Sequence, residues 1–229
     1  MLPRTVLLAS TNPHKLVEIR ALCAGFPLQV ISPADLDFPL PPVVETGASF
    51  EANAVAKATS AADAARAAGR HALWVLADDS GLEVDALGGA PGVHSARYAL
   101  ALDAGCGRRN GTGGERADLD RRNIRRLLAE LHGLAAPRRA ARFVCVLVLV
   151  GCGEAALTVR GEVEGSITTA CRGTGRFGYD PVFYHAASGR TFGEMTAGEK
   201  AGVSHRGVAL RRLRERLPAR FGHAARQVE

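Results

Sequence analysis

Two adjacent carboxylates, Asp78 and Asp79, follow an apolar run that extends from Leu73 to Ala77. A run of this length that stops at polar residues and glycine is typical of a buried strand, so the acidic pair is predicted in a turn between strands at 73–77 and 82–85. Carboxylates at the end of a buried strand are costly unless a divalent metal, a lysine or a phosphate-bound ion joins them. Asp-Asp-Ser-Gly is also ordinary turn composition. The segment alone therefore leaves a metal site and a simple turn as equal alternatives.

The positive charges of the chain indicate an anionic partner. The formal net charge is +6, which suits nucleic acid or a phosphorylated small molecule. Among 29 basic residues, only Lys15, Lys57 and Lys200 are lysines. Lysine is a compact point charge that suits phosphate, whereas arginine offers a planar fork. The positions of these lysines are therefore the first places to look for a phosphate site.

Lys15 follows a polar turn between a predicted strand at 5–9 and a predicted helix at 13–24. Asn12 is a good N-cap, and Pro13 suits the first helical position. A strand, a polar turn and a helix N-terminus that carries a lysine form an arrangement able to bind phosphate. The glycines of a Walker A loop are absent, so this turn is not one. Strand–turn–helix units are also frequent in proteins that bind no phosphate.

A second lysine, Lys57, lies in an alanine-rich helix predicted at 46–68. Glu45, Glu51 and Asn53 gather near the start of this helix, and Asn53 shares a face with Lys57 because the two are four residues apart. The group could form part of a site. It could equally be a solvated helix start, where acidic residues favour the helix dipole.

The last third of the chain contains a glycine-rich aromatic loop and two helix starts. In the loop at 171–184, Phe177 and Tyr179 could stack on a base or could fill the edge of the core. Thr196 begins a capping box that precedes Lys200. A further helix is predicted from Ser204 to Pro218, and its first turn contains His205 and Arg206. Basic side chains are unfavourable at a helix N-terminus unless an anion lies there. This region therefore indicates an anionic ligand.

Length and composition predict one domain of two lobes over residues 1–218, followed by a frayed tail at 219–229. The Gly- and Arg-rich segment at 100–117 is predicted to be a mobile surface loop, with a helix following at 118–132. The five cysteines include no C-x-x-C pair, which favours a reduced, cytoplasmic protein without structural zinc. No apolar run approaches the roughly 18–20 residues of a membrane helix, so no membrane partner is expected.

Five motifs occur in one order along almost the whole chain. They are STNPHK at 10–15, ETGASFEANAVAKA at 45–58, LADDSGLEVDALGGAPGVHSARY at 76–98, GTGRFGYDPVF at 173–183 and EKAGVSHRG at 199–207. Together they resemble the inosine triphosphate pyrophosphatase family, which includes the bacterial dITP/XTP pyrophosphatases. All three lysines fall inside these motifs. The segment at 100–117 is longer than the corresponding segment usual in that family.

The resemblance implies an α/β fold, with an elongated mixed β-sheet flanked by helices and two lobes that enclose a nucleotide cleft. It implies a homodimer that hydrolyses ITP, dITP and XTP to the monophosphate and pyrophosphate with Mg²⁺. Asp79 would be the proton acceptor and a metal ligand, with Glu45 and Asp78 as further candidate ligands. The expected substrate-binding residues are Ser10, Thr11, Asn12, Pro13, His14, Lys15, Ser80, Phe177, Gly178, Tyr179, Asp180, Lys200, His205 and Arg206.

In this interpretation Lys15, Lys200 and Arg206 oppose the charge of the triphosphate. Phe177 would stack on the base, and Arg206 or a backbone amide would donate to the 6-oxo group that adenine lacks. A donor that faces the adenine amine is a mismatch. No residue explains the rejection of GTP. Two alternatives are a Maf-type pyrophosphatase for modified pyrimidine nucleotides and a basic nucleic-acid-binding protein. The scattered basic residues and the 5% aromatic content argue against nucleic acid as a partner.

Overall fold

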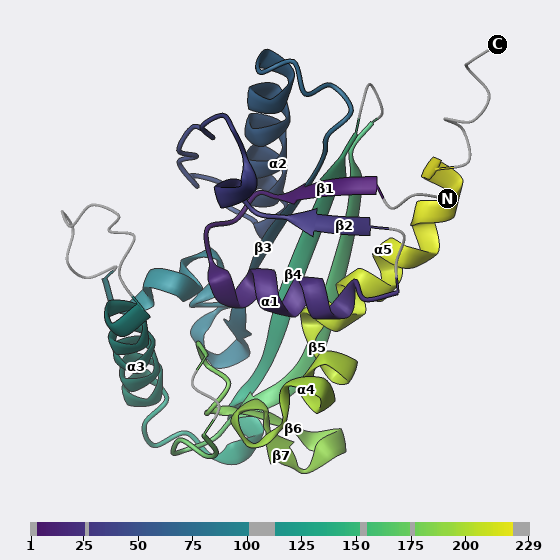
Figure 1. Ribbon diagram of the computed structural model, residues 1–229. Coiled ribbons are helices and arrows are strands. Elements are labelled where there is room, and N and C mark those ends of the chain that lie inside the picture. The colour runs from purple at the N-terminus through teal and green to yellow at the C-terminus, as the bar shows by residue number, and fades with distance from the viewer. Residues whose placement is uncertain (1–3, 26–27, 101–112, 152–154, 175–176, 222–229) are drawn as a thin grey trace. The chain divides into compact units, whose positions relative to one another are not determined.

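The computed structural model describes residues 4–25, 28–100, 113–151, 155–174 and 177–221 (Figure 1). The helices in these ranges are α1 (Pro13–Leu22), α2 (Phe50–Ala67), α3 (Gly113–Glu130), α4 (Ala197–Val203) and α5 (His205–Phe221). The strands are β1 (Arg4–Leu8), β2 (Leu28–Ile31), β3 (Trp74–Val84), β4 (Ala140–Val150), β5 (Leu157–Ile167), β6 (Phe183–His185) and β7 (Arg190–Thr191). None of the helices in the described part of the chain is both long enough and apolar enough to span a membrane.

The strands form a mixed sheet in the order β2-β1-β3-β4-β5-β6-β7. β1 pairs in parallel with β2 and β3, whereas β6 pairs antiparallel with β5 and β7. Parallel pairs need a crossover connection, and α1 and α2 supply the helices that follow β1 and β2. The mixed sheet and its helices confirm the predicted α/β class.

The chain divides into two compact units, and β3, β4 and β5 each contribute residues to both. Unit one comprises residues 1–79, 145–162 and 205–229, and unit two comprises residues 80–144 and 163–204.

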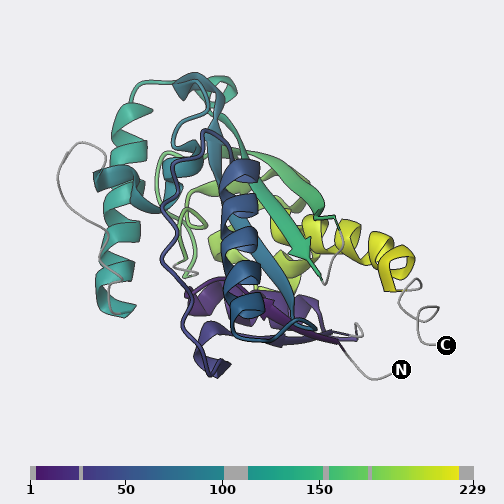
Figure 2. The ribbon, with the colours of Figure 1, turned by 90° about the horizontal axis from the view of Figure 1, so that it is seen from above.

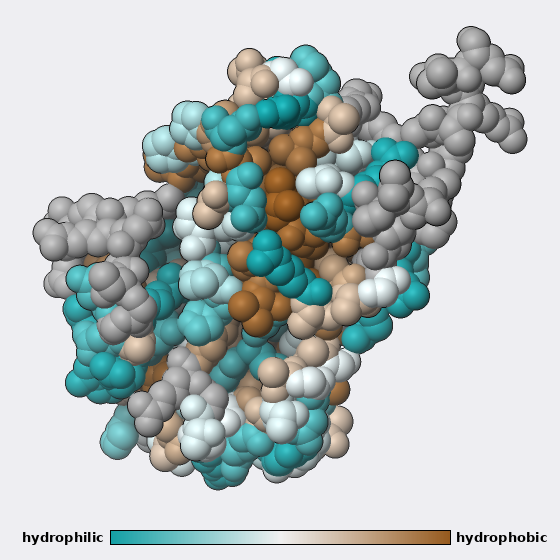
Figure 3. Space-filling view, viewed as in Figure 1, coloured by the Kyte–Doolittle hydropathy of each residue, from teal (hydrophilic) through white to brown (hydrophobic). Residues whose placement is uncertain are grey.

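Unit one packs helices on both faces of its strands because successive strand residues point to opposite sides. On one face, Leu76 of β3 joins a core that includes Ile19 of α1 and Leu213 of α5. On the other face, Val75 of β3 packs with Ala61 of α2, and Figure 2 shows α2 alongside β3. Figure 3 shows apolar side chains on the outer surface over β1, β2 and α1. Successive side chains of β3 alternate between these two faces, and this alternation determines which way each later residue of β3 points.

Unit two has its own apolar core. Phe143, Phe183 and Phe192 pack together, with ring centroids 4.6–5.9 Å apart. Leu127 of α3 and Tyr179 of the aromatic loop belong to the same cluster. Because Tyr179 is buried here and its hydroxyl donates to the backbone oxygen of Ser95 at 3.0 Å, the core-filling interpretation applies to this ring.

Several predicted boundaries were wrong. The segment Asp78–Gly81 is not a turn, because β3 is continuous from Trp74 to Val84. Helix α3 begins at Gly113, so residues 113–117 are helical, while residues 101–112 of the predicted loop lie outside the described residues. Helix α5 passes through the predicted stop at Pro218 to Phe221, and the rest of the predicted tail lies outside the described residues.

Candidate active site

The two carboxylates of β3 lie on opposite faces of the strand. Leu76 precedes Asp78 by two residues and Ala77 precedes Asp79 by two, so the alternation of β3 carries Asp78 to the α1 and α5 side and Asp79 to the α2 side. Their contacts agree with this division, as given below. Two adjacent acids in a strand therefore serve two different environments.

On the α2 side, Asp79 is held by donors from one helix. Lys57 Nζ lies 2.7 Å from Asp79 Oδ1, and Asn53 Nδ2 donates to Asp79 Oδ2 at 3.3 Å. Lys57 Nζ also lies 3.5 Å from Glu45 Oε1, so its ammonium stands between two carboxylates. We call Glu45, Asn53, Lys57 and Asp79 the Asp79 face. Its charged side chains are all partly exposed.

Asn53 is itself fixed by the start of α2. The helix begins after Ser49, whose hydroxyl accepts from the amide of Ala52 and caps the first turn. The amide of Gly47 donates to Asn53 Oδ1 at 2.9 Å. A Cβ at Gly47 would lie 2.6 Å from that same oxygen, so a side chain there would displace Asn53. Of the two alternatives left open by the sequence, the contacts of Asn53 and Lys57 favour a group that does more than end the helix in solvent.

Burial is the main influence on Asp79. It raises the pKa of the Asp79 carboxyl above its ordinary value, and the nearby charge of Glu45 adds to the rise, while Lys57 opposes both. A carboxylate with a raised pKa is a better proton acceptor than an ordinary one. Each Asp79 oxygen receives one of the donors above and keeps a second lone pair that can accept a further hydrogen bond.

On the α1 and α5 side, Asp78 has an exposed fraction of 0% and contacts groups from three elements. Lys15 of α1 pairs with Oδ1, while Oδ2 lies 3.3 Å from Arg206 Nε of α5 and 3.1 Å from Cys145 Sγ of β4. Arg206 also pairs with Glu18 of α1. We call Lys15, Glu18, Asp78, Cys145 and Arg206 the Asp78 face.

Burial opposes the charged form of Asp78, but Lys15 and Arg206 outweigh it and hold the pKa far below its ordinary value. Burial also opposes the charge of Arg206, yet Asp78 and Glu18 raise its pKa above the ordinary value. The same cations that satisfy Asp78 occupy its two oxygens. Both oxygens of Asp78 therefore point into the protein and accept from its side chains.

Local sequence explains how these cations reach β3. Asn12 Oδ1 accepts from the amide of His14 at 3.0 Å, so α1 starts at Pro13 and presents Lys15 in its first turn. Arg206 lies in the first turn of α5, which crosses β5 closely at Gly161. A Cβ at Gly161 would lie 2.3 Å from the carbonyl oxygen of His205. Only glycine lets α5 approach this far.

In unit two, Lys200 of α4 contacts residues of the aromatic loop. Its Nζ lies 2.6 Å from Asp180 Oδ2 and 5.4 Å from the centroid of Phe177. The amide of Gly178 donates to Asp120 Oδ2 at 3.0 Å, which ties the loop to α3. The predicted residues Phe177, Gly178, Asp180 and Lys200 therefore lie together in this unit.

The remaining predicted residues lie before and at the start of α1, in β3 and at the start of α5. Ser10, Thr11, Pro13 and His14 lie around the turn that leads into α1, partly or fully exposed. Ser80 follows Asp79 in β3 and is partly buried, whereas His205 is buried at the start of α5.

Sequence reasoning missed two members of the Asp78 face. Glu18 resembles any acidic residue on a helix surface, although it is three residues from Lys15 and therefore shares its helix face. Cys145 lies inside an apolar strand and gave no signal. Among the described residues, no group of three or more His, Cys, Asp or Glu side chains could hold a metal ion.

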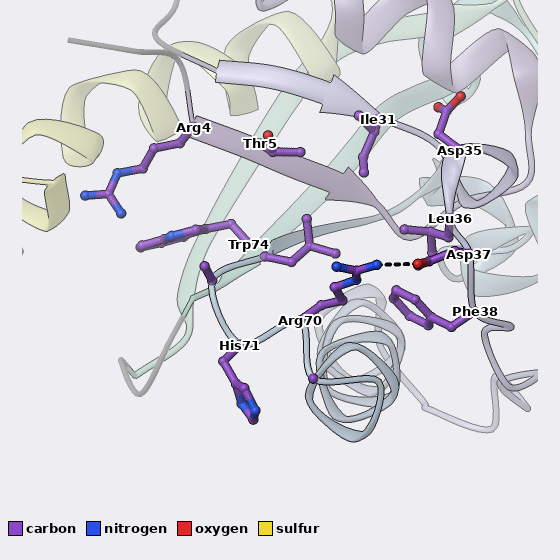
Figure 4. A pocket seen from close by; sticks show the side chains of 13 residues that line it. Arg4, Thr5, Ile31, Asp35, Leu36, Asp37, Phe38, Arg70, His71 and Trp74 are labelled. Atoms are coloured by element: carbon purple, nitrogen blue, oxygen red, sulfur yellow. Dashed lines mark hydrogen bonds and ion pairs between the residues drawn. The ribbon is translucent and has the colours of Figure 1, made fainter.

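A pocket of about 850 Å³ in unit one lies away from both faces (Figure 4). Figure 4 shows Arg70 reaching to Asp37, with Trp74 and Phe38 nearby. Its lining includes none of the predicted site residues.

Comparison with known proteins gives the family. A model described as the Ham1 family matches residues 6–216. The chain belongs to the Ham1 family. A curated relative from Anaeromyxobacter dehalogenans, named dITP/XTP pyrophosphatase, is 48% identical over 93% of this chain and 97% of the relative. A protein of the same name from Lactobacillus johnsonii is 44% identical over 93% of this chain and 95% of its own length.

Solved Ham1 structures have the same fold. The Coxiella burnetii Ham1 protein is 36% identical, with a TM-score of 0.75 over 96% of this chain and 100% of that one. The Staphylococcus aureus Ham1 protein is 34% identical, with a TM-score of 0.74 over 94% of this chain and 99% of that one. The resemblance inferred from the five motifs is confirmed.

Proposed function

We propose that this protein hydrolyses dITP, XTP and ITP to the nucleoside monophosphate and pyrophosphate, and so removes non-standard purines from the nucleotide pool. The protein is a nucleoside triphosphate pyrophosphatase, a hydrolase of phosphoric anhydrides, as its curated Ham1 relatives are. The observation that carries the proposal is the Asp79 carboxylate, held by Asn53 and Lys57 on a partly exposed face.

Asp79 is the proposed proton acceptor. Lys57 donates to one oxygen of the Asp79 carboxylate and Asn53 donates to the other. The plane of the carboxylate is therefore set before substrate arrives. The free lone pairs can accept a hydrogen bond from a water that attacks the α-phosphorus. The raised pKa of Asp79 favours transfer of the water proton to it.

Mg²⁺ fits the Asp79 face. Glu45 and Asp79 supply carboxylate oxygens, and Lys57 already places a positive charge between them. Mg²⁺ is usually bound through one or two carboxylates together with substrate phosphates rather than in an all-protein cage. When bound, the ion would neutralise charge on the phosphates. We therefore propose Asp79 and Glu45 as its protein ligands.

The charges of unit one also support a metal requirement. Around β3, the four carboxylates of Glu18, Glu45, Asp78 and Asp79 face the three cations of Lys15, Lys57 and Arg206. A triphosphate adds about four negative charges. Because these carboxylates outnumber the cations, the group as a whole does not offset the charge of the substrate without an added cation.

Lys15 and Arg206 are the proposed phosphate-binding cations of unit one, with the turn at 10–14, Ser80 and His205 as further substrate contacts. For the base, we propose the unit-two loop at 177–180 and Lys200. Phe177 would stack, and Lys200 near its ring is the candidate for interaction with the 6-oxo group. Tyr179 would support the loop from the core.

The test is release of pyrophosphate from dITP, XTP, ITP, dATP, GTP and ATP, each with Mg²⁺ and with EDTA. We expect release from the first three to exceed release from dATP and ATP by orders of magnitude, and to stop in EDTA. Equal rates on dATP and dITP would contradict the substrate proposal, and unchanged rates in EDTA would contradict the metal proposal. Release from 5-methyl-UTP alone would favour the Maf-type alternative.

A homodimer is also proposed on the family resemblance, and a cytoplasmic location on the cysteine pattern. Size-exclusion chromatography with light scattering should give twice the 24.1 kDa chain mass. A mass of one chain at micromolar concentration would exclude the stable dimer.

A further inference from the structure

We propose that Asp78 is a positioning residue that fixes Lys15 and Arg206 for the triphosphate, rather than a ligand of the metal. The inference rests on the proposed function, because it assigns a role within the same site. It stands on the opposite orientation of Asp78 and Asp79 in β3 and on the contacts of the buried carboxylate.

The Asp78 carboxylate is enclosed by the protein. Both Asp78 oxygens accept from donors within unit one, and the side chain has no exposed surface. A metal ligand that binds substrate phosphates must present an oxygen to solvent. Asp79 and Glu45 keep exposed surface, and Asp78 does not.

The Asp78 carboxylate joins cations from two helices. Lys15 comes from α1 and Arg206 from α5, and Asp78 is their common partner. Arg206 has an exposed fraction of 2% and gains a second carboxylate from Glu18. Lys15 has an exposed fraction of 16% and is the cation of this face that reaches the surface most. Asp78 therefore links Lys15, the more exposed cation, to Arg206, which is almost fully buried and is also paired with Glu18.

The position of the Lys15 ammonium is expected to affect the reaction rate. A lysine side chain has about 2 kcal/mol of rotamer entropy, so an unheld ammonium does not stay at one place near a phosphate. A small misplacement of a charge that stabilises a transition state lowers the rate strongly. If Asp78 acted only through its charge, Asp78→Asn would strengthen anion binding. If Asp78 positions Lys15, the same substitution lowers the rate, so the two roles predict different results.

A labelling experiment tests the positioning without reference to activity. The chain contains three lysines, so acetic anhydride labelling followed by peptide mass spectrometry reports on each one. In Asp78→Asn we expect Lys15 to be acetylated at least about fivefold faster, while Lys57 and Lys200 keep their rates within twofold, because their partners Asp79 and Asp180 are intact. Asp63→Asn, an exposed acid of α2, is the matched control and should change none of the three.

An unchanged rate at Lys15, or an equal rise at all three lysines, would overturn the proposal. If Asp78→Asn folds but is too unstable for labelling, its urea unfolding midpoint is compared with that of Asp78→Asn combined with Lys15→Met. Removing both partners leaves no unpaired ammonium beside residue 78, so the double variant should have the higher unfolding midpoint. A double variant no more stable than the single one would also overturn the proposal.

A kinetic experiment separates positioning from metal binding. With dITP, Asp78→Asn should lower kcat about tenfold or more, leave the dissociation constant for inorganic tripolyphosphate in EDTA unchanged or lower, and keep the Mg²⁺ concentration for half-maximal rate within twofold. A shift of tenfold or more in that Mg²⁺ concentration would make Asp78 a metal ligand and overturn the proposal. If the wild-type protein hydrolyses no nucleotide, the proposed function fails, whereas the labelling result still decides the role of Asp78.

Discussion

The Asp78 face and the Asp79 face start from adjacent, chemically identical residues and are opposite in character. Asp78 is enclosed and paired with Lys15 and Arg206, and its pKa is far below the ordinary value. Asp79 is partly exposed, and its pKa is raised. The comparison shows that burial alone does not set the behaviour of an acid. The number and placement of cations around it decide whether it supports the structure or can take part in chemistry.

The strongest way to break this comparison is Asp79→Asn. We expect kcat for dITP to fall about 10²-fold or more, because the amide cannot accept the water proton and is a poor metal ligand. Pyrophosphate release measures the rate, and circular dichroism checks the fold. Asp63→Asn, exposed on α2, is the matched control and should keep full activity. Near-normal turnover by Asp79→Asn would remove Asp79 from the mechanism.

Glu45→Gln sharpens the assignment of the metal to the Asp79 face. Loss of one carboxylate ligand should raise the Mg²⁺ concentration for half-maximal rate about tenfold. Glu51→Gln, exposed in the first turn of α2, is the control and should leave that concentration unchanged. A Mg²⁺ titration with equal midpoints for Glu45→Gln and wild type would exclude Glu45 as a ligand.

Lys15→Ala tests the surface cation of the Asp78 face. We expect kcat/KM for dITP to fall about tenfold, because a charge that opposes the triphosphate is lost. Arg20→Ala, at an exposed position on the same helix, should leave kcat/KM unchanged. A Lys15 variant that differs from wild type only in its thermal midpoint would show that the phosphate role is wrong.

Cys145→Ala has the smallest expected effect and concerns stability. Its thiol donates to Asp78, so its loss should cost about 1 kcal/mol beyond the cost of removing a buried sulfur. Cys23→Ala, in the same apolar core, measures the cost of the sulfur alone. Urea unfolding compares the two variants, and both should keep turnover within twofold. Equal destabilisation would mean that the thiol hydrogen bond contributes nothing.

Much of the fold follows from local sequence patterns. The apolar run before Asp78 predicted a strand, and Asn12 and Thr196 predicted helix starts that the structure has. The predicted turn at Asp78–Gly81 was wrong because the cations that stabilise Asp78 inside a continuous strand are distant in sequence. Lys15 and Arg206 reach this segment from positions 63 and 128 residues away.

The split of the two acids was hidden for a related reason. With a turn at Asp78–Gly81, both carboxylates could meet one metal, whereas a continuous strand sends them to opposite faces. Glu18 had a weak signal, its spacing from Lys15, and Cys145 had none, because a cysteine in an apolar strand normally predicts only core packing. Long-range pairing of charges is not visible in local periodicity.

The most direct test of the account is hydrolysis of dITP with Mg²⁺ in water enriched in oxygen-18, with mass spectrometry of both products. The account places the attacking water on the α-phosphorus, beside Asp79. It predicts one oxygen-18 atom in dIMP and none in pyrophosphate. Oxygen-18 in the pyrophosphate, or release of inorganic phosphate with dIDP, would contradict it.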